Sequence, residues 1–212
     1  MKKTAFCFDL DGTITEQELL PLIAKEAGIY EEINLLTQIT LKGLIPFQNS
    51  FKLRVKLLST IPISIVTNIV NQVRLDKNIA QFIRENKEHC YVVTGNLDVW
   101  INEIIGEKLG CNYFSSKANF NNDTLLGINS ILNKYDAVKQ LKEEYHQVIA
   151  IGDSMNDCSM FQLADIGIAY GGIHEPVESL KKISQYIVYD SRPLVNILNH
   201  IRTKTSSYQY QL

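Results

Sequence analysis

The chain has 212 residues, which is enough for one domain with a sizeable core, or for one domain plus a small insertion. Hydrophobic residues make up 45% of the chain and charged residues 21%, proportions that are ordinary for a globular protein and argue against disorder. The net charge of -2 creates no global basic field, so we expect neither nucleic acid nor a membrane among the partners. Any anion must be bound locally.

Neither a membrane span nor an export signal is expected. No apolar run approaches the roughly 20 residues that a helix needs to cross a bilayer, and the N-terminal MKKTAFCFDLDG lacks the small-residue cleavage site of a signal peptide. The four cysteines form no CxxC pair, and three of them sit in or near apolar runs. This usage is typical of free thiols in a reducing compartment, so we expect a cytoplasmic protein.

Short apolar runs alternate with helical patterns along most of the chain. The first run, residues 4–8, has the continuous apolar character of a strand that is buried on both faces of a sheet. Buried strands that alternate with helices predict an α/β fold with a doubly wound parallel sheet. The expected strands are residues 4–8, 90–93, 148–151, 166–169 and 186–188, and the expected helices are residues 79–86, 99–109, 136–144, 154–164 and 193–201.

One long region, residues 16–76, interrupts this alternation, because its periodicity is helical and it contains no buried strand. Four amphipathic helices are expected there. The first two end near Gly28 and Gly43, the third begins near Phe47, and the fourth follows Pro62.

These helices predict an inserted helical-bundle cap. We expect a core domain of residues 1–15 and 76–212 and a cap domain of residues 16–75. An insertion directly above the carboxyl end of a strand is well placed to act as a lid. The polar C-terminal residues 203–212 are expected to form a flexible tail.

Polar side chains stand where the expected strands end, and in a parallel sheet these ends meet at one edge, where ligands bind. Carboxylates gathered there would repel one another by several kcal/mol at an effective dielectric constant of about 20. A divalent cation would remove this repulsion, and oxygen ligands of this kind suit Mg²⁺. The polar groups are Asp9 and Asp11 after the first strand, Thr94, Gly95 and Asn96 after the second, Asp153, Asn156 and Asp157 after the third, and Lys134 just before a helix.

These groups together predict a site for a metal ion and a phosphate group. Asp9 and Asp153 are the expected carboxylate ligands of the cation, with a main-chain carbonyl near Asp11 as a third ligand. Together with the cation, Lys134 and the main-chain N–H groups of the helix that follows residues 9–13 would form a phosphate cradle. The hydroxyl group of Thr94 can donate a further hydrogen bond to the same anion.

The spacing of the first two carboxylates allows a division of labour. Asp9 is placed to attack phosphorus, whereas a turn at Gly12 can direct Asp11 away from the metal, to protonate the leaving oxygen and later to accept a proton from water. The sequence therefore predicts a phosphomonoester hydrolase that acts through an aspartyl-phosphate.

Two simpler interpretations of the first motif are weaker. A plain turn explains the first motif but not the others. An EF-hand loop would need glycine in place of Ile14 and glutamate in place of Leu20.

The four motifs together are similar to those of a known family. DLDGT, VVTGN, a lone lysine at position 134 and GDSMND, in this order, resemble the haloacid dehalogenase superfamily of aspartate-nucleophile phosphotransferases. The resemblance continues into the insertion, where TEQELLPLIAKEAGIYEEI and PFQNSFKLRVKLL are similar to the helical cap of the phosphoserine phosphatase branch. The stretch between Cys111 and Lys134 is loosely similar to a hairpin of the family.

The resemblance implies a role for each matching residue. It implies a Mg²⁺ enzyme in which Asp9 is the nucleophile and Asp11 is the general acid and base. It also implies that Asp9, Asp11 and Asp153 are the metal ligands. Asp157 would hold Lys134 or a metal-bound water. The residues implied to contact the phosphoryl group or the substrate are Thr94, Gly95, Lys134 and Asn156.

Two cap residues, Glu18 and Arg54, match positions that read the ammonium and carboxylate groups of the substrate in the phosphoserine phosphatase branch. On the residues alone, Arg54 is equally well explained as a solvated side chain, and Glu18 as a charge that complements a helix N-terminus. Asn96 and Leu97 stand where the family often has Gly-Phe, next to the substrate.

The expected partner is a small phosphomonoester, and L-phosphoserine, an intermediate of serine biosynthesis, is the leading candidate. A sugar, polyol or amino-alcohol phosphate remains an alternative substrate. A phosphomutase reaction and a phosphate-binding module without turnover also remain open. The sequence predicts no oligomeric state.

Other distinctive residues are expected to be structural. The four histidines show no metal-ligand spacing and are expected to lie at the surface or in local hydrogen bonds. Trp100 is expected in the core or at an amphipathic surface. The loop at residues 170–176 lies at another strand end, and its two glycines allow it to border the site.

Overall fold

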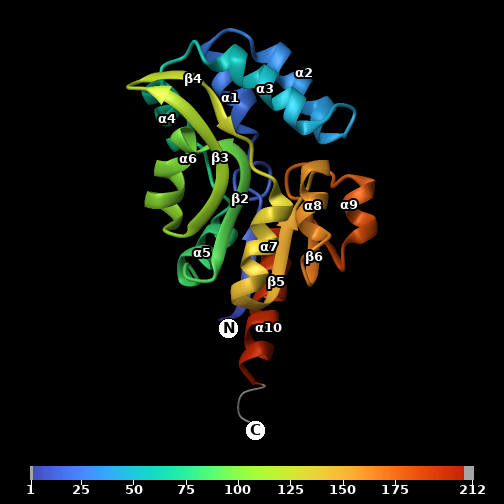
Figure 1. The fold of residues 1–212 in the computed structure, drawn as a ribbon. Coiled ribbons are helices and arrows are strands. Elements are labelled where there is room, and N and C mark those ends of the chain that lie inside the picture. Colours follow the sequence, from blue (N-terminus) through green and yellow to red (C-terminus); the bar gives the residue numbers. More distant parts are fainter. Residues whose placement is uncertain (1, 208–212) are drawn as a thin grey trace.

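The computed structural model describes residues 2–207, which form one seven-stranded sheet with helices on both faces and a group of four helices beyond the carboxyl ends of the strands (Figure 1). The strand order is β4-β3-β2-β1-β5-β6-β7, and every neighbouring pair is parallel except β3 and β4. The strands are β1 (Lys2–Phe8), β2 (Cys90–Leu97), β3 (Asn112–Asn121), β4 (Thr124–Ser130), β5 (Tyr145–Gly152), β6 (Ile166–Tyr170) and β7 (Tyr186–Val188).

The helices that cover the sheet lie between these strands or after them. α6 continues directly into a π-helical turn, η1, and the segment after β5 begins with a 3₁₀ turn, η2, before α8. Their bounds are α5 (Lys77–Glu85), α6 (Asp98–Glu103), η1 (Ile104–Leu109), α7 (Lys134–Glu144), η2 (Met155–Asp157), α8 (Cys158–Phe161), α9 (Glu178–Ile183) and α10 (Ser191–Ser207).

β1 lies at the centre of the sheet and is buried on both faces. Phe6 and Phe8 point to one face, where their ring centroids lie 5.2 and 6.2 Å from that of Phe82 on α5. Ala5 and Cys7 point to the opposite face and belong to the apolar cluster built with α7, α8 and α9. A strand that is apolar on both sides must be covered on both sides. The predicted doubly wound α/β fold is therefore confirmed.

All five predicted strands are present, as β1, β2, β5, β6 and β7. The hairpin of β3 and β4 is polar and rich in asparagine, so its residues alone did not predict strands, and only the family resemblance indicated it. α9 was not predicted. The helix expected over residues 154–164 is shorter than predicted, because its first turn is the 3₁₀ segment η2 and α8 ends at Phe161.

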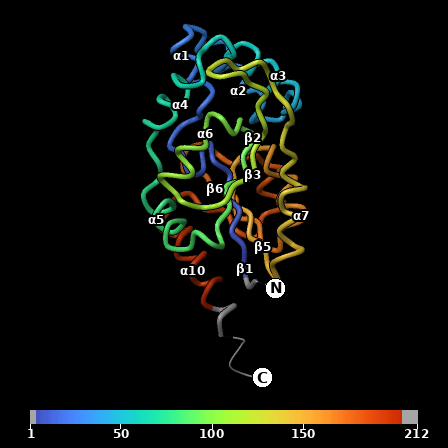
Figure 2. The backbone as a smooth tube through the Cα atoms, turned by 60° about the vertical axis from the view of Figure 1, so that its left-hand side comes forward, coloured from blue at the N-terminus to red at the C-terminus, as the bar shows by residue number. Residues whose placement is uncertain are grey.

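Four helices form the region between β1 and α5: α1 (Leu19–Glu26), α2 (Tyr30–Leu41), α3 (Phe47–Leu58) and α4 (Ile63–Asn71). Figure 2 shows them gathered at the end of the molecule opposite the N-terminus. The two linkers to the sheet run side by side, since Glu16 N donates to Arg74 O at 3.0 Å and Asp76 N donates to Ile14 O at 2.8 Å. We propose that residues 16–75 are a cap domain and that residues 1–15 and 76–212 are the core domain.

The β3–β4 hairpin reaches the cap at a second place. Asp123, at the tip of the hairpin, accepts hydrogen bonds from Ser64 N and Ser64 Oγ, both at 2.7 Å, through its carboxylate. Its main-chain carbonyl accepts from Ile63 N at 2.9 Å. These donors lie in the first turn of α4, whose N-cap residue Pro62 provides no side-chain acceptor. The hairpin therefore supplies the acceptors for the N–H groups at this helix N-terminus.

The last helix, α10, continues through Ser207, past residue 203, where a tail was expected to begin. Residues 208–212 of that expected tail lie outside the described residues.

Within residues 2–207, no single helix is long and apolar enough to cross a membrane. α3 and α4 meet this criterion of length and composition only as a pair, and they are bent by 111° at the break between them.

Candidate active site

The predicted site residues gather at the carboxyl end of β1, which has β2 on one side and β5 on the other. The strand order reverses at this point, and crevices for ligands form at such a switch point. A cavity of about 60 Å³ lies here, between the sheet and the cap. Its walls include eight of the ten predicted site residues: Asp9, Asp11, Glu18, Arg54, Thr94, Gly95, Lys134 and Asn156.

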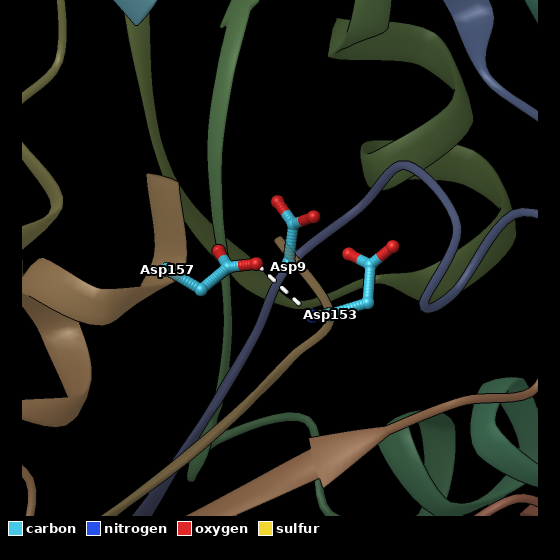
Figure 3. A group of neighbouring side chains, drawn as sticks. All are labelled: Asp9, Asp153 and Asp157. Atoms are coloured by element: carbon cyan, nitrogen blue, oxygen red, sulfur yellow. Dashed lines mark hydrogen bonds between the residues drawn. The ribbon is translucent and has the colours of Figure 1, made fainter. Parts of the chain in front are cut away.

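Three carboxylates and one ammonium group meet beside this cavity. Asp9, Asp153 and Asp157 are buried, and each has a carboxylate oxygen within 4.8 Å of the other two (Figure 3). Lys134, the first residue of α7, donates through Nζ to Asp9 Oδ1 at 2.5 Å and to Asp157 Oδ1 at 2.6 Å. A single positive charge therefore faces three carboxylates in a place where little water can screen them.

Asp157 holds the turn that follows β5. Its Oδ2 accepts from Asp153 N at 3.0 Å, from Ser154 N at 2.9 Å and from Ser154 Oγ at 3.0 Å, while its Oδ1 accepts from Lys134. Figure 3 shows the bond to the main chain of Asp153 as a dashed line. Asp157 thus lies beside Lys134, as expected, and its two oxygens fix both Lys134 and the segment that carries Asp153.

Burial and mutual repulsion make the ionised forms of these carboxylates unfavourable. Burial raises the pKa of Asp9 well above its usual value, Asp157 adds to this effect, and Lys134 opposes it. Burial also raises the pKa of Asp153, with contributions of the same sign from Asp157 and Asp9. Among the described residues, Asp153 Oδ1 has no hydrogen-bond partner although it is buried. This set of oxygens fits a divalent cation that prefers oxygen ligands.

The side chain of Asp11 is separate from this cluster. Gly12 has a φ of +72°, a left-handed value that favours glycine, and the chain turns there directly after Asp11. Asp11 Oδ1 accepts from Leu19 N at 2.8 Å, and Oδ2 accepts from Asn96 Nδ2. Burial, together with the charge of Glu18, raises the pKa of Asp11 to about 7. A carboxyl group with this pKa can hold or release a proton near neutral pH.

The helix expected after the first motif is α1 (Leu19–Glu26). Residues 11–14 form a turn, and the next helix, α1, begins only at Leu19. The free N–H group at the start of α1 points to the Asp11 carboxylate. Leu19 N is thus engaged by Asp11, and the contribution of the other N–H groups of α1 to a phosphate cradle stays a prediction.

The cap contributes two opposite charges to the cavity wall. Arg54 on α3 is 4% exposed and donates through Nη1 to Thr37 Oγ1 at 3.0 Å; its Nε has no partner among the described residues. Glu18 Oε1 lies 3.4 Å from His174 Nε2. Arg54 is buried rather than solvated, and a buried guanidinium with unused donors is suited to an anionic ligand.

Three contributors to the site were not identified from the sequence. The ring of Phe47 packs directly on Gly95, where an added Cβ would lie 2.2 Å from Phe47 Cζ, so a larger residue at position 95 would displace this ring. Thr37 orients Arg54, and His174 reaches Glu18 from the loop at residues 170–176. The pattern of α3 predicted a helix, but no local signal indicates which side chain of a cap will meet which strand end.

The contact between His174 and Glu18 predicts a pH-dependent stability. The Glu18 carboxylate raises the pKa of His174 above its usual 6.5, with a smaller contribution of the same sign from Asp11, while partial burial acts in the opposite direction. The charged form is therefore favoured in the folded state, and its contribution is complete below about pH 6 and is lost as the pH rises through the higher folded value. His174→Gln is expected to cost about 0.5–1 kcal/mol at pH 5.5 and almost nothing at pH 9.

Thermal or denaturant unfolding at the two pH values measures this difference. His146→Gln is the matched control, because His146 is an exposed histidine on β5. A loss in His174→Gln that is the same at both pH values would mean that the ion pair contributes nothing.

Comparison with known proteins gives the family. The family model for haloacid dehalogenase-like hydrolases matches residues 3–165, more than half of the chain. The chain belongs to the haloacid dehalogenase-like hydrolase family, as the motifs and the position of Asp9 after the first strand predicted.

Individual relatives are similar along almost the entire chain. The phosphoserine phosphatase of Methanocaldococcus jannaschii is 30% identical over 214 residues, which cover 95% of this chain and 99% of that protein. A solved structure of a phospho-aspartyl intermediate analogue of phosphoserine phosphatase is 28% identical, with a TM-score of 0.81 and coverage of 93% of this chain and 99% of its own. A substrate-bound phosphoserine phosphatase complex is also 28% identical, with a TM-score of 0.80 and coverage of 94% and 98%.

Proposed function

We propose that this protein is a Mg²⁺-dependent phosphoserine phosphatase, which hydrolyses L-phosphoserine to L-serine and phosphate through an aspartyl-phosphate. The observation that carries the substrate assignment is the pair of opposite charges on the cap side of the cavity, Glu18 and Arg54. A substrate with one ammonium and one carboxylate group would match both charges. The names of the similar proteins described above support the same substrate.

Arg54 is prepared to bind a carboxylate. Its side chain is already buried, so little conformational entropy would be lost on binding, and Thr37 holds one end of the guanidinium while the Nε remains free. Thr37 Oγ1 in turn donates to Ile33 O at 2.9 Å, which fixes the hydroxyl. The stacked rings of Phe47 and Phe51, 5.3 Å apart, supply an apolar wall that excludes water.

Asp9 is the proposed nucleophile. Its Oδ1 is held by Lys134 at 2.5 Å, which leaves Oδ2 to attack phosphorus. The Lys134 ammonium would also stabilise the charge that develops on the phosphoryl oxygens, and Thr94, Gly95 and Asn156 line the same cavity, where they can donate hydrogen bonds to these oxygens. Attack forms the Asp9–phosphorus bond and breaks the bond between phosphorus and the serine oxygen.

The proposed ligands of Mg²⁺ are Asp9 and Asp153, whose oxygens lie together, and Asp11. Because the Asp11 side chain accepts hydrogen bonds from Leu19 and Asn96, Asp11 would bind the cation through its main-chain carbonyl. When bound, the cation would offset the repulsion between the carboxylates and draw negative charge from the phosphoryl group.

Asp11 is the proposed general acid and base. It lines the cavity and accepts a hydrogen bond from Leu19 N at the start of the cap, and its pKa of about 7 allows it to carry a proton before the first step. The proton passes to the departing serine oxygen. Asp11 then accepts a proton from the water that hydrolyses the aspartyl-phosphate, so the enzyme returns to its initial state.

Phosphate release from a panel of esters tests this function. L-Phosphoserine is expected to give the highest kcat/KM, and phosphoethanolamine, which lacks the carboxylate, is expected to be poorer by about 10²–10⁴-fold. Arg54→Met is expected to reduce phosphoserine turnover to the level of phosphoethanolamine, because both changes remove the same pair of charge-assisted hydrogen bonds. A chelator is expected to abolish release from every ester, and added Mg²⁺ to restore it.

Arg192→Met is the matched control, since Arg192 is an arginine of α10 whose side chain is 78% exposed. If a sugar or polyol phosphate is the best substrate and Arg54→Met leaves phosphoserine turnover intact, the substrate assignment is wrong. If no ester releases phosphate, the enzymatic proposal itself is wrong.

The proposed partner is thus a small phosphomonoester, without nucleic acid or membrane. The four cysteines are free, and Cys7 and Cys90 are buried. Free buried thiols support the proposal of a reducing compartment, the cytoplasm.

A further inference from the structure

Asn96 lies at an irregular point of β2, directly beside the cavity. Between β2 and β3, Thr94 pairs with Ser115 and Leu97 pairs with Ser116, so three steps along β2 correspond to one step along β3. Gly95 and Asn96 therefore bulge from the ladder, and Ser116 Oγ stabilises the bulge by donating to Gly95 O at 2.7 Å. A bulge re-aims the side chains that it contains.

The re-aimed side chain of Asn96 is buried and directed to Asp11. It is 5% exposed, and asparagine is unfavourable both inside strands and in buried positions unless its polar atoms have partners. Asn96 Nδ2 donates to Asp11 Oδ2 and approaches Thr94 Oγ1 at 3.4 Å. The NH₂ group is the only donor of the amide, and Asp11 Oδ2 can accept its hydrogen bond whether or not Asp11 holds a proton on its other oxygen.

The two oxygens of Asp11 are consequently held from two sides. The cap holds Oδ1 through Leu19 N at 2.8 Å, and the core holds Oδ2 through Asn96. With both oxygens fixed, the carboxyl group cannot rotate about its last bond without losing a hydrogen bond, so the lone pairs that remain free point in fixed directions. General acid catalysis depends strongly on such orientation.

We propose that Asn96 is a positioning residue that aims the carboxyl group of Asp11 at the leaving oxygen of the substrate. This role rests on the proposed function, because it assigns the bulge of β2 to the proton-transfer step of that reaction. Asn96 does not itself exchange a proton. It holds the Asp11 carboxyl group outside the cluster of Asp9, Asp153 and Asp157.

Two esters with different leaving groups distinguish positioning from a merely structural role, because a structural defect would lower kcat/KM equally for both. An alkoxide leaving group, as in phosphoserine, needs a proton from Asp11, whereas the p-nitrophenolate of p-nitrophenyl phosphate is stable enough to leave without one. Asn96→Ala is expected to lower kcat/KM for phosphoserine by about 10–100-fold and for p-nitrophenyl phosphate by less than about threefold. In an Asp11→Asn background, Asn96→Ala is expected to have no further effect on phosphoserine.

Two further variants keep the test decisive. Asn96→Leu keeps nearly the size of the side chain but cannot donate a hydrogen bond to Asp11, and it adds no charge beside the phosphate; it is expected to show the same selective loss if Asn96→Ala does not fold. Asn86→Ala is the matched control: Asn86 is also a buried asparagine, but it precedes the amino end of β2, so any loss should be equal for the two esters.

NMR detects the contact between Asn96 and Asp11 without an activity assay. The side-chain NH₂ resonances of Asn96 are expected to differ between the wild-type protein and Asp11→Ala. Equal losses on both esters in the Asn96 variants, or unshifted Asn96 resonances in Asp11→Ala, would overturn the positioning role alone. Release of phosphate from neither ester by the wild-type protein would overturn the proposed function, and the catalytic meaning of Asn96 with it.

Discussion

Asp9→Asn is expected to lower phosphate release from L-phosphoserine by at least about 10⁴-fold, because it removes the proposed nucleophile. The substitution keeps the size and shape of the side chain. Lys134 retains its bond of 2.6 Å to Asp157, and burial already disfavours the charged form of Asp9, so the variant is expected to fold. Acid quenching with labelled substrate is expected to trap a covalent phosphoprotein in the wild type and none in the variant.

Asp136→Asn is the matched control for this experiment. Asp136 is an exposed carboxylate in the first turn of α7, two residues from Lys134, and its replacement is expected to leave turnover unchanged. Undiminished phosphate release by Asp9→Asn would exclude Asp9 as the nucleophile. The absence of a labelled intermediate in the wild type, with full turnover, would instead indicate direct attack by water.

Lys134→Met is expected to reduce the free energy of unfolding by about 3–5 kcal/mol, because it leaves two buried carboxylates without their cation. The Lys134 side chain is 2% exposed and lies 2.5 Å from Asp9 and 2.6 Å from Asp157, and methionine fills nearly the same space without a charge. Denaturant unfolding in a buffer free of divalent cations measures the loss, because a bound cation would offset part of the repulsion.

Lys142→Met provides the comparison. Lys142 Nζ pairs with Asp165 at 2.7 Å, a similar distance, but both side chains are 35% exposed, and such a surface pair is worth about 0–1 kcal/mol. The two variants therefore remove ion pairs of similar length that differ in burial. Equal losses of unfolding free energy would contradict the claim that burial makes Lys134 essential to the site.

Three of the four motifs were predictable because each one combines a strand with the polar residues that follow it, whereas Lys134 begins a helix. Once β1, β2 and β5 are recognised as parallel neighbours, Asp9, Thr94 and Asp153 must lie at one edge of the sheet. The order of the motifs is then sufficient to indicate the family. The structure adds the hydrogen bonds from Lys134 to Asp9 and Asp157.

The cap side of the site was less predictable, because it depends on how separate elements pack. The contact between Phe47 and Gly95 and that between Glu18 and His174 join residues that lie far apart in the chain and have no common motif. Asn96 was recognisable as a departure from the family pattern, but its partner Asp11 follows only from the bulge in β2. Periodicity predicts a helix and its apolar face, and leaves the docking partner open.

The hairpin contact at Asp123 has a consequence for the opening of the site. The cap is fastened to the core by its paired linkers and, separately, by three hydrogen bonds between the hairpin tip and the first turn of α4 (Figure 1). Two attachments define an axis, so we expect the proposed cap to swing about the line between them more easily than it lifts away. In the proposed hydrolase, Asp123 would then influence the rate at which substrate enters and product leaves, from a surface remote from the proposed chemistry.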